Sequence, residues 1–304
     1  MNLTTTSDGK INLHIWRTGI TYKQQKEAIY SQEWNNLLFS VLSPPQKEKN
    51  IQYYDIRQSL PYPNNTFDTV FALRIMEHLT PGEGENFIKE IFRVLKPQGI
   101  VRLSTPDLED VCRNYLKQLE VNVANPSLEN IVKYDWAVLE LLDQMVRDKP
   151  GGLMVEAIKN NHYDLEYSKT RYGDVFAEFY LPPTQKKKTQ KSKQSSNWKQ
   201  KIKNSFPIKK IKGAVRKFKS FYKNKAKEKQ QEINQDPRQS KEVHLWMYDR
   251  LSLQKMLNKM GFREITQQSY KSSMINNWEK YNFDKSNFGD YPLEPSLHME
   301  GKKP

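Results

Sequence analysis

The sequence predicts an α/β fold, because short apolar strands alternate with helical stretches through its first third. Thr69–Leu73 is a continuous apolar run of the kind found in buried parallel strands. Pro81–Leu95 then carries apolar residues at helical spacing, and the turn Lys96–Gly99 leads into a strand at Ile100–Ser104. This strand–helix–strand unit predicts a mostly parallel sheet, to which a helical insertion and a basic insert are added further along the chain.

The remaining elements follow from the same patterns. Tyr22–Leu38 has no Gly or Pro and is predicted to be weakly helical or irregular. Asp249 or Ser252 begins a helix that Gly261 ends. Strands are expected at Ile11–Ile15, Ile51–Ile56, Phe262–Gln268 and Ser296–Gly301, and helices at Leu108–Leu119, Ser127–Val146 and Leu251–Met260.

Four parts are expected along the chain. Residues 1–112 form the N-terminal part of the core, and residues 113–181 form a helical insertion. Residues 182–240 form the basic insert, in part disordered or an amphipathic helix, and residues 241–304 complete the core sheet.

The positive charge of the chain is concentrated in one segment. The 304 residues carry a net charge of +14, yet residues 186–229 alone hold 18 Lys and Arg against one acid, Glu228. That segment has a net charge of +17, which leaves −3 for the rest of the chain. A nucleic-acid partner is therefore not expected, since no recognition motif accompanies the charge.

Cysteine content and hydropathy indicate the compartment. The single cysteine, Cys112, excludes a disulfide framework and a cysteine-rich zinc site. The N-terminus lacks the pattern of a signal peptide, and no apolar run approaches 18 residues. We expect a cytoplasmic protein.

The basic insert also contains an apolar stripe. Within Ile208–Tyr222, apolar residues recur at spacings of three and four, and Lys or Arg fills most positions between them. Such a pattern is typical of a helix that lies on an anionic membrane surface. The alternative is a solvated basic linker. The first reading predicts a peripheral location at the inner membrane surface.

Several motifs between Asp55 and Asp107 resemble one enzyme family. They are Leu60–Pro63 (LPYP), Phe67-Asp68, Glu77–Leu79 (EHL) and Arg93–Gly99 (RVLKPQG). This stretch is similar to class I S-adenosylmethionine-dependent methyltransferases of the methyltransferase type 11 group. Two further stretches resemble a subgroup common in bacterial surface-polysaccharide gene clusters, Tyr134–Gly152 and His244–Phe262.

The resemblance implies a fold and an activity. The fold is a Rossmann-like class I methyltransferase sheet with helices on both faces, and the cofactor is S-adenosylmethionine. The acceptor implied is a small molecule, a saccharide or a lipid-linked glycan. The Lys-Pro-Gln-Gly turn is structural in this family, and Gly99 is free to adopt a positive φ there.

The resemblance also implies cofactor-binding residues. Asp55 and Ile56 would border the adenine, Leu73 would lie beside the methionine part, and Gly19 is the glycine that remains near the first loop. Each position has a structural alternative: Asp55 can cap its own turn, and Leu73 can belong to the strand core.

Glu77 and His78 are the candidates for catalysis, because they follow the strand Thr69–Leu73 on the cofactor side of the sheet. His78 could act as general base on an acceptor hydroxyl. A structural role is the stronger interpretation for both, since the EHL motif is general in the family. Asp107 could face the acceptor, but N-capping of the helix from Leu108 is the stronger interpretation.

No metal site is expected. The five histidines are scattered through the sequence without the spacing of a zinc site. Methyl transfer from a sulfonium needs alignment of the acceptor rather than a metal.

Two positions depart from the family pattern. Trp16 and Arg17 stand where a glycine-rich turn is expected, and Leu38 or Phe39 stands where an acid usually binds the ribose. These departures bear on cofactor binding, and they leave open a second function. The second function is a non-catalytic methyltransferase-like binding or scaffold protein.

Overall fold

The fold is given by a computed structural model. It describes residues 3–17, 34–39, 51–146, 152–160, 162–175, 244–281, 283–284 and 296–304. The basic insert with its stripe at Ile208–Tyr222, and Gly19 in the first loop, lie outside the described residues. No helix in the described ranges has the length and apolar character that crossing a bilayer requires.

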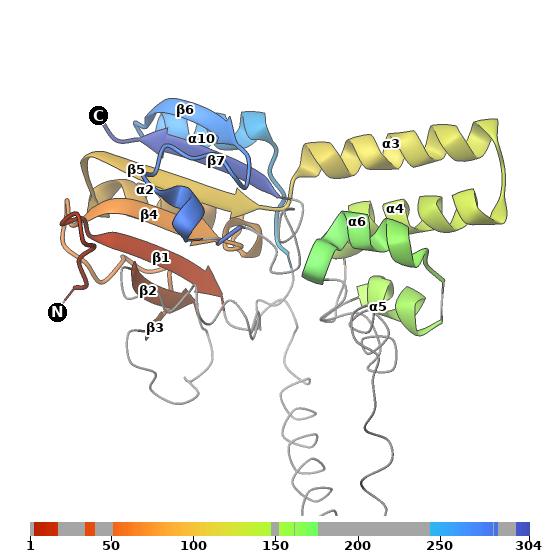
Figure 1. The fold of residues 1–304 in the computed structure, drawn as a ribbon, viewed down its shortest axis with the longest axis horizontal. Coiled ribbons are helices and arrows are strands. Elements are labelled where there is room, and N and C mark those ends of the chain that lie inside the picture. The colour runs from red at the N-terminus through yellow and green to blue at the C-terminus, as the bar shows by residue number, and fades with distance from the viewer. Residues whose placement is uncertain are drawn as a thin grey trace, which may run out of the picture.

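Seven strands form one mixed sheet in the order β3-β2-β1-β4-β5-β7-β6 (Figure 1). Strands β1 to β5 run parallel to one another, and β7 runs antiparallel to both β5 and β6. The expected Rossmann-like α/β sheet, completed by strands from the C-terminal part of the chain, is confirmed. The strands are β1 (Asn12–Arg17), β2 (Trp34–Phe39), β3 (Ile51–Tyr54), β4 (Phe67–Leu73), β5 (Leu95–Thr105), β6 (Arg263–Gln268) and β7 (Leu297–Lys302).

Two helices cover one face of the sheet, and both begin with a capping box. In α2 (Pro81–Val94), Thr80 is the N-cap and exchanges hydrogen bonds with Glu83. The N-cap of α10 (Arg250–Lys259) is Asp249, which exchanges hydrogen bonds with Ser252. Asp249 is one of the two N-caps that the sequence predicts. Gly261 follows with φ +100°, which confirms the predicted helix end. The apolar sides of both helices belong to the main core cluster with β1, β4 and β5.

The opposite face is covered by the connection between β6 and β7. A 3₁₀ turn, η3 (Trp278–Lys280), and neighbouring rings pack on Trp34 of β2 and Phe71 of β4. His14 of β1 lies within this cluster, with its ring 4.8 Å from that of Phe283. Within the described residues, this face therefore has an aromatic cover.

Helices α3 to α6 form a separate helical unit that lies beyond the carboxyl ends of β1 and β5 (Figure 1). Asp107 caps α3 by accepting hydrogen bonds from the amides of Glu109 and Asp110, which confirms its predicted capping role. This unit has a small hydrophobic core of its own, formed by Trp136, Met154 and Ile158. The helices are α3 (Leu108–Ala124), α4 (Leu128–Val146), α5 (Gly152–Lys159) and α6 (Leu165–Val175).

Some predicted boundaries were wrong. Trp34–Phe39 forms the buried strand β2 rather than a helical or irregular segment, because it pairs with both β1 and β3. The helix from Leu108 runs on to Ala124, since no breaker precedes Pro126. At the Lys-Pro-Gln-Gly turn the positive φ, 67°, belongs to Gln98. Gly99 is needed for space instead, because a Cβ there would lie 2.8 Å from the carbonyl oxygen of Lys96.

Candidate functional site

The carboxyl ends of the parallel strands meet at one edge of the sheet. Leu73, the last residue of β4, pairs with Ser104 near the end of β5. The chain then turns through Arg74 at φ 55°, whose amide donates to the carbonyl of Ser104, into η1 (Met76–His78). Ligands of doubly wound sheets bind at such an edge. Glu77 and His78 therefore lie where the sequence predicts them.

Glu77 joins three segments at this edge. Its side chain is 1% exposed, and one carboxylate oxygen accepts a hydrogen bond of 3.2 Å from Thr105 of β5. Its other oxygen lies 3.8 Å from the Arg74 guanidinium. Its backbone carbonyl accepts from the amide of Leu245 at 2.7 Å, which fixes the segment 244–248 over η1. These contacts tie η1 to β5 and to the segment 244–248.

The same contact brings a second histidine to the edge. His244 lies beside His78, with ring centroids 5.0 Å apart at an angle of 71°. One ligand atom from each of Glu77, His78 and His244 lies within 4.8 Å of the others. The sequence places His244 on the far side of the basic insert, so no local spacing indicated this cluster.

At the end of β3, Asp55 closes its own turn. Its carboxylate accepts hydrogen bonds from the Arg57 guanidinium at 2.7 Å and from the Arg57 amide at 3.2 Å. Asp55 is nevertheless partly exposed at the edge. Ile56 is 1% exposed and belongs to the main core, so it can offer only an apolar wall to a ligand. Leu73 is packed with the aromatic cover on the other face.

The first departure from the family pattern, Trp16 and Arg17 in place of a glycine-rich turn, is explained by the length of β1. Trp16 and Arg17 are the last two residues of this strand, and they pair with Leu38 and Phe39 of β2. The prediction that they occupy the loop was wrong. The indole of Trp16 packs with the aromatic cover, in a stacked arrangement with His14. Its buried Nε1 has no hydrogen-bond partner within the described ranges. The second departure stands, because β2 ends in buried apolar side chains.

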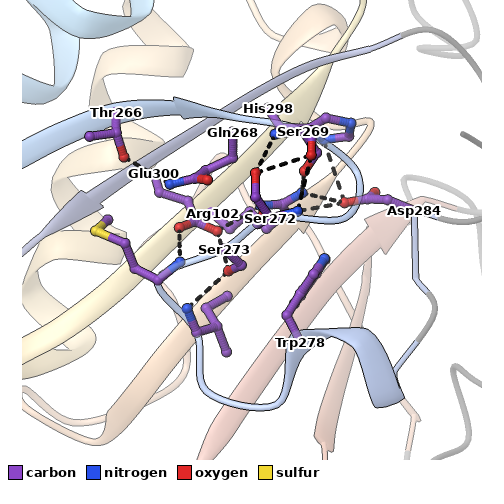
Figure 2. Close-up of polar contacts among 12 residues, drawn as sticks. Arg102, Thr266, Gln268, Ser269, Ser272, Ser273, Trp278, Asp284, His298 and Glu300 are labelled. Carbon is purple, nitrogen blue, oxygen red and sulfur yellow. Dashed lines mark hydrogen bonds and ion pairs between the residues drawn. The ribbon is translucent and has the colours of Figure 1, made fainter.

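A buried arginine is the largest feature that the sequence did not reveal. Arg102 of β5 is fully buried and lies between Asp284 and Glu300, with nitrogen–oxygen distances of 2.8 and 2.7 Å (Figure 2). It also donates to the carbonyls of Ser269 and Ser272. The ring of Trp278 lies 4.3 Å from the guanidinium carbon.

Burial also perturbs two histidines on this face. Burial lowers the pKa of His14 to about 3, against smaller opposing effects of Asn36 and Asp284. Burial lowers the pKa of His298 to about 4. The charge of Asp284 opposes this shift, and the charges of Arg102 and Arg74 add to it. Both side chains are therefore neutral at pH 7.

The helical unit holds an open cleft of about 440 Å³. One of its lining residues, Arg171, bonds to the buried Glu140 and to Asp110 in the first turn of α3. That turn follows β5 directly, so this side of the cleft lies close to the edge of the sheet. The other lining residues are mostly amides, hydroxyls and lysines: Asn114, Lys117, Gln118, Val121, Asn130, Lys133, Tyr167 and Thr170.

Comparison with known families agrees with this arrangement of the sheet. Residues 40–103 match the family Methyltransf_11, described as a methyltransferase domain. The match spans the segment from before β3 to the body of β5, and it includes Asp55, Glu77 and His78. Residues 40–103, which carry β3, β4 and most of β5, are thus similar to a methyltransferase domain.

Solved structures offer weaker likenesses. An S-adenosylmethionine-dependent methyltransferase from Archaeoglobus fulgidus is 11% identical over 96% of this chain and 86% of its own, with a TM-score of 0.36. The [4+2]-cyclase SpnF is 24% identical over 34% of this chain, with a TM-score of 0.25. A Burkholderia thailandensis N1-methyltransferase, solved with S-adenosylhomocysteine, is 14% identical over 31% of this chain, with a TM-score of 0.25. The chain spans 41% of the cyclase and 45% of the Burkholderia enzyme.

Proposed function

We propose that this protein is an S-adenosylmethionine-dependent methyltransferase. The observation that carries the proposal is the parallel sheet edge that bears Asp55, Glu77 and His78, in the segment that matches a methyltransferase domain. When bound, S-adenosylmethionine supplies an electrophilic methyl group on a sulfonium. The work left to the chain is to bind the acceptor, orient it and exclude water.

The cofactor side of the edge is assigned to β1, β3 and β4. Asp55 offers a carboxylate to the adenine or the ribose, and Ile56 and Leu73 offer apolar walls. Gly19 follows β1 in the sequence and would allow close approach of the backbone. The alternative of a non-catalytic binding protein is not favoured, since Trp16 lies in the strand.

The acceptor side is assigned to the end of β5 and to the helical unit. We assign a saccharide or lipid-linked glycan acceptor, because the cleft between α3, α4 and α6 offers the amides and hydroxyls that bind sugar hydroxyls. Its Lys117 would attract an anionic group such as a phosphate, whereas Arg171 is already paired with Glu140 and Asp110. Glu77 and His78 act here as positioning residues, because both are almost fully buried.

A thermal shift with S-adenosylhomocysteine tests the proposal. A ligand at 100 times its Kd stabilises the folded state by about 2.7 kcal/mol, so the melting temperature should rise by several degrees. Asp55→Ala should reduce the shift, whereas Asp135→Ala, a change on the exposed side of α4, should leave it unchanged. No shift of the full chain at millimolar ligand would contradict the proposal.

The basic insert is assigned to an anionic membrane surface at the cytoplasmic side. The support is the sequence of Ile208–Tyr222, with its apolar stripe and cationic remainder. The full chain should co-sediment with anionic vesicles and not with neutral ones. Replacing Ile211, Val215 and Phe218 by Ser should abolish this sedimentation. Equal sedimentation of both chains would instead assign the insert to a solvated linker.

A further inference from the structure

We propose a zinc site formed by Glu77, His78 and His244. One ligand atom of each residue lies within 4.8 Å of the other two, and the two imidazole rings are 5.0 Å apart. Glu77 and His78 are buried and His244 is half-buried, so the ligand atoms meet away from bulk water. The inference rests on this cluster and does not depend on the proposed methyltransferase activity.

The chemistry of the three groups selects the metal. Two imidazole nitrogens and one carboxylate oxygen form a ligand set that binds Zn²⁺ and leaves a fourth position open. Ligand atoms around a tetrahedral zinc are about 3.3 Å apart. The widest separation in the cluster, up to 4.8 Å, therefore has to shorten by about 1.5 Å, which rotation of the half-buried His244 ring can supply.

The surroundings of Glu77 support a ligand role. Thr105 donates to one carboxylate oxygen at 3.2 Å, and Arg74 lies 3.8 Å from the other. These contacts orient the carboxylate, as outer-shell partners of a metal ligand do. The amide of Leu245 fixes the neighbouring His244 by donating to the Glu77 carbonyl.

The position of the site gives the metal a role. Glu77 and His78 follow β4, whereas His244 begins the part of the chain after the basic insert. The same segment pairs with the start of α3, because Tyr248 bridges to Asp107 and accepts from the amide of Leu108. Zinc would therefore hold together the sheet edge, the helical unit and the C-terminal part. As a zinc ligand, His78 would serve in positioning and not as a general base.

Zinc titration of the untagged full chain, after dialysis against a chelator, tests the site. The wild-type chain should bind one Zn²⁺, and Co²⁺ in its place should give the visible bands of tetrahedral coordination. His244→Ala should remove these bands and weaken zinc binding more than Thr105→Val does. Thr105→Val should weaken it by about 10- to 100-fold, since it removes only an outer contact.

The control is His162→Ala, which removes a half-exposed histidine of the helical unit that pairs with Asp135. It should bind zinc as the wild type does. Wild-type affinity in His244→Ala, or no zinc bound by the wild-type chain at micromolar concentration, would overturn the proposal. If His244→Ala does not fold, the zinc affinity of Thr105→Val tests the site instead. Wild-type zinc affinity in Thr105→Val would then contradict the proposal. These titrations contain no S-adenosylmethionine, so their failure is distinct from failure of the proposed function.

Discussion

The face of the sheet under α2 and α10 is packed with aliphatic side chains and phenylalanine, whereas the opposite face buries an arginine, two carboxylates and a group of aromatic rings. The helical face is stabilised mainly by apolar burial, which tolerates small shifts in geometry. The aromatic face depends on charges that must stay paired inside the protein. The two faces should therefore respond differently to substitution and to pH.

Arg102→Met should have the largest effect. It leaves Asp284 and Glu300 buried without their cation, which typically costs 3–5 kcal/mol, so we expect a loss of about 4 kcal/mol in the free energy of unfolding. Urea denaturation measures this loss of stability. Arg113→Met, in an exposed ion pair of α3, is the control and should change stability by less than about 1 kcal/mol.

The triple variant Arg102→Met, Asp284→Leu, Glu300→Leu sharpens this prediction. Because replacement of a whole buried network by apolar residues is often neutral, it should recover most of the stability lost by Arg102→Met alone. A triple variant no more stable than the single one would mean that packing, and not unpaired charge, accounts for the loss.

On the helical face, Leu257→Ala should cost about 3 kcal/mol. Leu257 is fully buried in α10, and the loss combines reduced apolar burial with a cavity. The same urea experiment measures it. This loss should not depend on pH between 5 and 8, and a clear dependence would contradict the division between the faces.

Acid should destabilise the aromatic face through His298. Its folded pKa of about 4 lies below the unfolded value of 6.5, so the unfolded chain binds the proton first as the pH falls. The neutral form therefore stabilises the fold above pH 6.5, and this stability is lost between pH 6.5 and 4. At pH 5 the loss should be about 2 kcal/mol. His298→Gln should flatten the profile in part, since His14 titrates in the same direction. An unchanged profile in this variant would rule out His298 as its source.

The smallest effect is expected at a helix cap. Thr80→Ala removes the hydroxyl that accepts from the Glu83 amide, while the Thr80 amide can still donate to the Glu83 carboxylate; the loss should be about 1 kcal/mol. Thr80→Ser keeps the hydroxyl and serves as the control, with stability close to the wild type. Equal losses in both variants would show that the methyl group and not the cap matters.

The helical face could be predicted from sequence because its signals are local. The apolar spacing of Pro81–Leu95, the N-cap at Asp249 and Gly261 at the helix end all lie within one element. The motif around Glu77 likewise placed that residue at the sheet edge. These signals lie within a few residues of one another, so no long-range contact is needed to interpret them.

The aromatic face and the histidine cluster could not be predicted in this way. Arg102 meets Glu300 only because β5 pairs with β7, and it meets Asp284 through the connection between β6 and β7. His244 meets His78 across the basic insert. The end of β1 was misplaced at Trp16 for a related reason. Trp and Arg side chains occur both at the end of a strand and at the start of a loop. Only the pairing of Trp16 and Arg17 with β2 shows that they belong to the strand.

Isothermal titration of the full chain with S-adenosylmethionine tests the central claim most directly. The account predicts one site per chain with a Kd in the micromolar range, weakened by Asp55→Ala and not by Asp135→Ala. Absence of heat at millimolar S-adenosylmethionine, with the protein folded, would contradict the assignment of the sheet edge as a methyltransferase site.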